Sequence, residues 1–226
     1  MNKKVSVVYM ICGLVFTVCL IVANIVSQKI VRIFGFDITA GLMIFPITYI
    51  INDLVAEVWG YRKVRLIIWM GFLLNFFAVF IFHMAIWLPS SHHFIYQNAL
   101  TVILLTSERL TVASFIAFLI GSFINAYVMS KMKVRQHGRH FGIRAIVSTI
   151  FGEGADSLVF FTIAFTGIVK HHHLIIMIFT QIILKTAYEI VLLPVTIRIV
   201  KWVKTYEHID VIDYGISYNP FKVKDI

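Results

Sequence analysis

The residues best suited to chemistry are four acids and one lysine that interrupt long apolar stretches of the sequence. Asp53 and Glu57 are four residues apart, so in a helix their side chains share one face. Glu153 and Asp156 interrupt a second apolar stretch, and Lys185 interrupts a third. A charged side chain near the centre of a bilayer costs about 2.5–3.5 kcal/mol, and such residues usually face a protein interior or a wet cavity. We therefore expect a polar cavity within a membrane-embedded bundle.

Neutral polar residues accompany these charges. Gln181 and Glu189 lie one helical turn on either side of Lys185 and extend it into a polar stripe. The other apolar stretches contain the amides of Asn24, Asn52, Asn75 and Asn125, and the ring of Tyr49. Carboxylate, amide and ring together suit a planar heterocycle with hydrogen-bonding groups, although this chemistry identifies no more than a small polar solute. The alternative is structural, with Lys185 neutralising Glu189 or one aspartate in a buried pair.

Composition places the chain in a membrane. Its 226 residues are 60% hydrophobic and only 14% charged, with a mean hydropathy of +0.89, whereas soluble domains are about 45–50% apolar and about 25% charged. The net charge of +9 comes from basic residues spread between apolar stretches rather than gathered in one patch, which argues against a nucleic-acid partner. Cys12 and Cys19 share one apolar stretch and indicate neither a disulfide framework nor a metal site.

Six stretches have the ~20 residues that a membrane-spanning helix needs, and they cover residues 6–28, 39–60, 66–88, 110–130, 145–169 and 174–201. If the N-terminus is cytoplasmic, fifteen of the 20 Lys and Arg residues lie on the cytoplasmic side. The sequence therefore predicts an all-α integral membrane protein with six transmembrane helices and both termini inside. Residues 1–205 would form the transmembrane domain, and residues 206–226 a polar cytoplasmic tail without a fold of its own.

Two segments suggest further architecture. The acids recur on the second and fifth spans, so a 3+3 inverted repeat is a hypothesis, because paired functional helices are common in such transporters. The small residues of GEGADS at 152–157 predict either a close helix approach or a break in the fifth span. The short apolar run at 99–105, within an external loop around 89–109, suggests an interfacial or re-entrant helix, or a packed loop.

Other classes of protein fit the sequence less well. The P-loop pattern G-x-x-x-x-G-K-[ST] does not occur in the sequence, and no arrangement of residues suggests a nucleophile with its base. The histidines at 171–173 are better explained by a solvated turn than by a metal. We therefore expect no cofactor, no metal site and no enzymatic activity. A purely structural membrane protein is the remaining alternative, although it would not need charges at mid-membrane.

Three motifs carry a family resemblance. They read FPITYIINDLVAEVWG, RLTVASFIAFLIGSFIN and STIFGEGADSLVFFTIAF, on the second, fourth and fifth spans. With them the chain resembles the queuosine precursor transporters, also called the vitamin uptake transporter family. The matching positions are Phe45, Pro46, Tyr49, Asp53, Arg109, Ala113, Ser114, Ser148, Thr149, Gly152 and Asp156. Asn24 and Lys185 match an Asn and a Lys of the family, and the tail IDVIDYGISYNPFK resembles the ending of longer members.

The resemblance implies uptake of 7-cyano- or 7-aminomethyl-7-deazaguanine across a bacterial inner membrane, for the queuosine modification of tRNA. On that basis we expect Asp53 or Asp156 to read the edge of the base, and Lys185 to balance charge or contact the 6-oxo group. Asn24 and Asn52 would be secondary contacts. Proton coupling, facilitated diffusion and a substrate-binding subunit energised by a separate ATPase all remain open. The expected partners are the base, the lipid bilayer and a second copy of the chain in a homodimer.

Overall fold

The structure is a computed structural model that describes residues 6–27, 29–33, 36–105 and 108–222. Six helical segments are long and apolar enough to cross a membrane, which confirms the predicted fold class. They are α1 (Val7–Val26), α2 (Phe45–Trp59, after a 3-10 turn at Ala40–Met43), α3 (Tyr61–Trp87), α5 (Glu108–Arg135), α6 (Phe141–Phe165) and α7 (His171–Glu207). Their apolar composition explains why they associate within a bilayer rather than in water.

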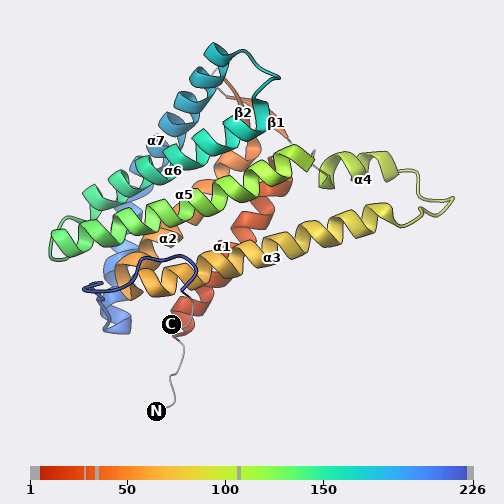
Figure 1. Ribbon diagram of the computed structural model, residues 1–226. Coiled ribbons are helices and arrows are strands. Elements are labelled where there is room, and N and C mark those ends of the chain that lie inside the picture. The colour runs from red at the N-terminus through yellow and green to blue at the C-terminus, as the bar shows by residue number, and fades with distance from the viewer. Residues whose placement is uncertain (1–5, 28, 34–35, 106–107, 223–226) are drawn as a thin grey trace.

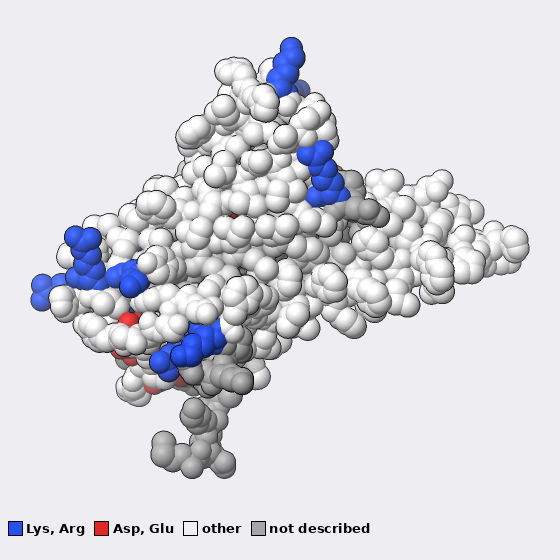
Figure 2. All heavy atoms as spheres, viewed as in Figure 1, with Lys and Arg blue, Asp and Glu red and all other residues white. Residues whose placement is uncertain are grey.

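Both ends of the described chain lie at the same end of the bundle (Figure 1). The Ser6 hydroxyl, which also caps α1, donates to Oε1 of Glu207 at the end of α7 over 2.6 Å. Because both ends lie at the same end of the bundle, the chain must run along the bundle an even number of times. Figure 2 shows Lys and Arg gathered towards two ends of the molecule with a largely uncharged surface between them. We call the end that carries the termini the inner end, and its cytoplasmic location stays a prediction from the charge count.

Two small elements lie between the spans at the opposite, outer end. β1 (Ile30–Ile33) and β2 (Phe36–Thr39) form an antiparallel hairpin that the sequence analysis did not predict. The predicted external loop contains α4 (Gln97–Leu104), which lies beside the end of α3 (Figure 1). The Gln97 side chain donates to the Ile86 carbonyl over 3.2 Å and ties the two helices together. The apolar run in this loop is therefore largely helical.

The small residues of the fifth span bring α5 and α6 into close contact. A Cβ atom built on Gly152 would lie 2.6 Å from Cβ of Asn125 and 3.0 Å from the Gly121 carbonyl oxygen, so only glycine fits there. Because α6 runs without interruption from Phe141 to Phe165, the predicted close approach is correct and the alternative of a broken helix is wrong. This contact fixes the face of α6 that carries Asp156.

The tail beyond α7 has no helix or strand among its described residues, but it is bonded to the inner end of the bundle. Asp213 accepts a hydrogen bond from the Tyr61 backbone amide at the start of α3 over 2.9 Å, and one from the Ser130 hydroxyl over 2.5 Å. The side chains of Arg65 and Trp69 donate to carbonyls of the tail over 2.9 and 2.8 Å. The extension that the sequence suggested to be without a fold is thus held across the helix ends.

Candidate functional site

A cavity of about 600 Å³ lies in the outer half of the bundle and reaches the hairpin and the start of α5. Pockets for small ligands typically measure ~300–1,000 Å³ and combine apolar walls with a few placed polar groups. The predicted site residues that line this cavity are Asn24, Asp156, Gln181 and Lys185. Its aromatic walls are Phe45, Phe115, Phe160, Phe161 and Phe165. The composition of the cavity therefore suits a flat polar molecule.

Lys185 forms the charged floor of the cavity together with two acids from α6. Its Nζ donates to Oε2 of Glu153 over 2.6 Å and to Oδ2 of Asp156 over 2.9 Å. The same ammonium lies 4.4 Å from the centre of the Phe45 ring, within the range of a cation–π contact. Asp156 and Lys185 line the cavity, whereas the buried Glu153 does not. Of the partners that the sequence suggested for Lys185, Glu189 or one aspartate, the structure shows the aspartate, Asp156, and adds Glu153.

Asp53 lies deeper in the bundle, outside the cavity. Its carboxyl group is fully buried, 3.3 Å from the Ser148 hydroxyl, and it also neighbours Asn125. Glu189 of α7 is an electrostatic neighbour of the same carboxyl group. Tyr49, one turn before Asp53 on α2, is also buried and outside the cavity lining. These residues fill the middle of the bundle, between the cavity and the inner end.

Glu57 belongs to a separate group of charges at the inner end. Its carboxylate accepts from Arg144 and from Lys204, each over 2.6 Å, and lies 3.9 Å from Nζ of Lys133. Lys133 also donates to the Glu57 carbonyl and to Asp210 of the tail, which Lys204 contacts over 2.9 Å. We call these five residues the inner ion-pair cluster. They join α2, α5, α6, α7 and the tail, so this end of the bundle is closed.

Asp210 shows the electrostatic balance of the inner ion-pair cluster. Partial burial alone would raise the pKa of Asp210, but the hydrogen bonds and positive charges of Lys133 and Lys204 outweigh that effect and lower it. From the sequence, these basic residues indicate only the orientation of the chain. Their contacts with Glu57 could not be predicted from helical spacing, because each lies on a different helix from Glu57.

The two asparagines among the predicted site residues, Asn24 and Asn52, each form a hydrogen bond with another asparagine. Nδ2 of Asn24 donates to Oδ1 of Asn75 over 3.1 Å, and both residues line the cavity. Nδ2 of Asn52 donates to Oδ1 of Asn125 over 2.7 Å in the buried middle of the bundle. The structure therefore brings four of the ten predicted residues to the cavity. The six that lie outside its lining are Tyr49, Asn52, Asp53, Glu57, Glu153 and Glu189.

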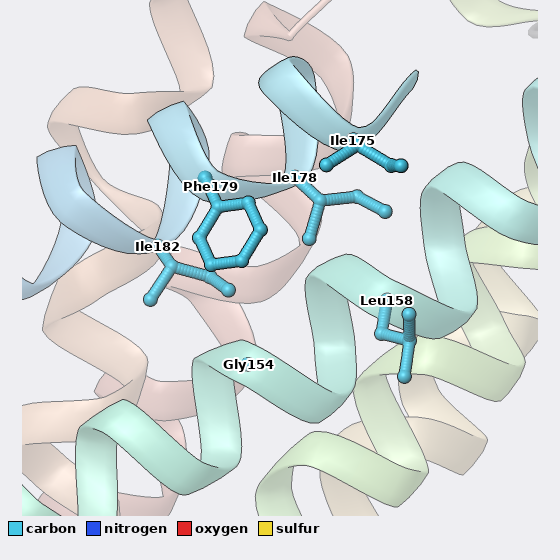
Figure 3. Close-up of a pocket in the computed structure, with 6 residues that line it drawn as sticks. All are labelled: Gly154, Leu158, Ile175, Ile178, Phe179 and Ile182. Carbon is cyan, nitrogen blue, oxygen red and sulfur yellow. The ribbon is translucent and has the colours of Figure 1, made fainter. Parts of the chain in front are cut away.

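Two further features of the bundle are an arginine contact at its outer end and a second pocket. Arg109 at the outer end donates from Nε to the Ile163 carbonyl and from a terminal nitrogen to the Thr166 carbonyl, each over 2.6 Å, so it fastens α5 to the end of α6. A second, smaller pocket between α6 and α7 has an entirely apolar lining (Figure 3). Its residues are Gly154, Leu158, Ile175, Ile178, Phe179 and Ile182. This pocket offers no group that could recognise a polar solute.

The fold and the cavity define a multi-pass membrane protein with a charged, aromatic-walled cavity. The model of the family described as "Putative vitamin uptake transporter" matches residues 39–199, more than half of the chain. The chain belongs to this family of transporters. The resemblance carried by its three motifs is thereby confirmed.

Several curated proteins are similar to the chain. A "Queuosine precursor transporter" of Escherichia coli (strain K12) is 29% identical over 147 residues, which cover 63% of this chain and 62% of that protein. A "Probable queuosine precursor transporter" of Bacillus subtilis (strain 168) is 25% identical over 179 residues, covering 79% and 77%. A third, from Haemophilus influenzae, is 30% identical over 132 residues, covering 58% and 54%. The chain thus spans less than two thirds of the first and third relatives, and no solved structure matches it.

Proposed function

We propose that this protein imports a queuosine precursor, a 7-deazaguanine base, across a bacterial inner membrane and does so without enzymatic chemistry. The observation that carries the proposal is the outer cavity, with an acid–lysine pair at its floor and aromatic walls. The names of the three similar proteins supply the substrate class. The concentration of basic residues at the inner end supports a cytoplasmic location for that end.

Asp156 is the better candidate for reading the edge of the base. A guanine-like edge offers an N–H and an amino group side by side, and one carboxylate can accept both in a two-point hydrogen bond. Asp156 lines the cavity, whereas Asp53 lies behind it, so the geometry favours Asp156 of the two aspartates. Lys185 can donate to the 6-oxo group on the same side of the ring, and Phe160 and Phe161 offer walls for its faces.

The two ends of the bundle have different roles in the proposed import. The cavity reaches the outer end, and the inner ion-pair cluster closes the other. This is the arrangement of an importer that is ready to accept substrate from outside, with the cluster acting as the inner barrier. Release into the cytoplasm then requires the contacts of Glu57 with Arg144 and Lys204 to break.

The test is uptake of labelled 7-cyano-7-deazaguanine into liposomes that contain only this protein, together with binding to the purified protein. We expect uptake by the unaltered chain. Asp156→Asn loses charge-assisted hydrogen bonds worth about 1.5–3 kcal/mol, so its binding should weaken about 10- to 150-fold. The control is Glu207→Gln, which neutralises an acid at the far end of α7 and should bind normally.

Each result bears on a different part of the proposal. Normal uptake by Asp156→Asn would remove Asp156 from the site. An unaltered protein that neither binds nor transports the base would show that the substrate class is wrong. Binding without transport would contradict import by the chain alone and indicate an energising partner.

A further inference from the structure

The middle of the bundle holds more buried acid than one base can neutralise. Four carboxyl groups come from α2, α6 and α7, and none of their residues is more than 7% exposed. They belong to Asp53, Glu153, Asp156 and Glu189. Lys185 is the cation that contacts this group, and it bonds to Glu153 and Asp156. If every acid were ionised, the group would carry three uncompensated negative charges away from water, which is strongly unfavourable.

Two of these three charges belong to Asp53 and Glu189, and the third belongs to Glu153 and Asp156, which share Lys185. The side chains of Asp53 and Glu189 are electrostatic neighbours, and no salt bridge joins either of them to a cation within the described part of the chain. An ionised carboxylate can only accept hydrogen bonds, whereas a protonated one has an O–H to donate. Two neighbouring buried carboxyl groups without a cation cannot both ionise at low cost, so a proton on one of them relieves the repulsion.

A second observation points to a small ligand at this place. The Tyr49 hydroxyl is completely enclosed and has no hydrogen-bond partner among the described residues. Tyr49 lies within electrostatic range of all four carboxyl groups. Its oxygen also abuts Gly121, beside Cβ of Asp156. A buried, unpartnered hydroxyl among these acids leaves a hydrogen-bonding position that a water molecule or a protonated carboxyl group could fill.

Among the residues that the structure describes, no salt bridge brings a cation to the pair in place of the proton. On α6 the neighbours of the pair are the neutral Ser148 and Thr149 together with Glu153, and on α5 the neighbour is the neutral Asn125. α1 contains no charged residue, and Arg65 of α3 donates to the tail. The charged groups beyond these belong to the floor of the cavity and to the inner ion-pair cluster, namely Lys185, Asp156, Glu57, Lys133, Arg144, Lys204 and Asp210.

The acids succeed one another between the cavity and the inner ion-pair cluster. Asp156 at the cavity shares Lys185 with Glu153. Glu153 interacts in turn with Glu189, which neighbours Asp53. Glu57 of the inner cluster follows Asp53 by one helical turn on the same helix. A proton entering from the outer cavity thus has a titratable group at each step.

We propose that the Asp53–Glu189 pair is a proton-binding site, and that its proton moves inward together with the imported base. This inference rests on the proposed function and names its driving force. With the proton bound, the pair carries one negative charge instead of two, and the inner ion-pair cluster stays closed. When the proton leaves, the second negative charge competes with Glu57 for Arg144 and Lys204 and weakens the contacts that close the inner end.

The first experiment measures coupling in the unaltered protein, reconstituted into liposomes with a trapped pH indicator. Adding 7-cyano-7-deazaguanine outside should acidify the interior. An inward gradient of about one pH unit should raise accumulation about tenfold if one proton accompanies each base. Import that proceeds to equilibrium, with no acidification and no response to the gradient, would overturn the proton site and leave the proposed function intact.

The second experiment assigns the proton to the pair. Glu189→Gln should lose the tenfold accumulation under the gradient while still exchanging labelled for unlabelled base, because exchange needs no net proton movement. Asp53→Asn should behave in the same way, and Glu207→Gln on the same helix as Glu189 should keep full accumulation. Exchange activity shows that each variant is folded. Gradient-driven accumulation by Glu189→Gln and Asp53→Asn would overturn the assignment, and absence of both binding and exchange in the unaltered protein would instead refute the proposed function.

Discussion

Lys185 illustrates how a single residue can serve both stability and binding in this bundle. Its ammonium forms salt bridges with two buried carboxylates and at the same time lines the cavity. Removing one partner of a buried ion pair usually costs about 3–5 kcal/mol, because the remaining charge is left uncompensated. Loss of Lys185 should therefore lower the stability of the folded protein, in addition to any effect on substrate binding.

Lys185→Met should lower the thermal unfolding temperature of the purified protein in detergent. The double variant Lys185→Met/Glu153→Gln should recover part of the loss, since it removes one of the stranded carboxylates, and the coupling should amount to about 0.5–3 kcal/mol. Lys201→Met, on an exposed position of the same helix, is the matched control and should unfold like the unaltered chain. Additive effects of the two substitutions would show that Lys185 and Glu153 do not depend on each other.

Among the elements, α5 and α6 behave as one unit because glycine allows their backbones to meet. Gly152→Ala would place a Cβ 2.6 Å from Cβ of Asn125, and such overpacking typically costs about 1–3 kcal/mol. Gly154→Ala on the same helix would meet only the end of Ile182 at 3.9 Å and should be neutral or slightly stabilising. Unfolding temperatures measured side by side test this contrast, and equal values for the two variants would contradict the close contact.

The elements also show what the sequence could and could not predict. The six spans follow from apolar length, and the placement of Asp156 and Lys185 on one cavity follows from charges that must avoid lipid. The hairpin at Ile30–Thr39 was missed because its strands have only four residues each, too few for a clear alternation. The docking of the tail was missed because Arg65 and Trp69 bind its backbone carbonyls, which no side-chain pattern reports.

The whole molecule is open towards one end and closed at the other. The cavity lining includes Ser114, whereas Ser148 beside Asp53 is fully buried. In a background with both native cysteines replaced, Ser114→Cys should react with a membrane-impermeant maleimide added outside the cell, and the base should slow that reaction. Ser148→Cys should react only after unfolding. Labelling of Ser114→Cys exclusively from the cytoplasmic side would reverse the orientation of the chain.

The contact between Glu57 and Arg144 has a consequence for the biosynthesis of the chain. These partners are 87 residues apart, and Lys204 follows Glu57 by 147 residues. The ribosome therefore delivers α2, with its two acids, to the insertion machinery long before either cation has been translated. Until then we expect α2 to remain beside the translocon or bound to a chaperone, because its unpaired acids are unfavourable in lipid. We therefore expect the later helices to stabilise α2 in the membrane, because they supply the cations that pair with Glu57.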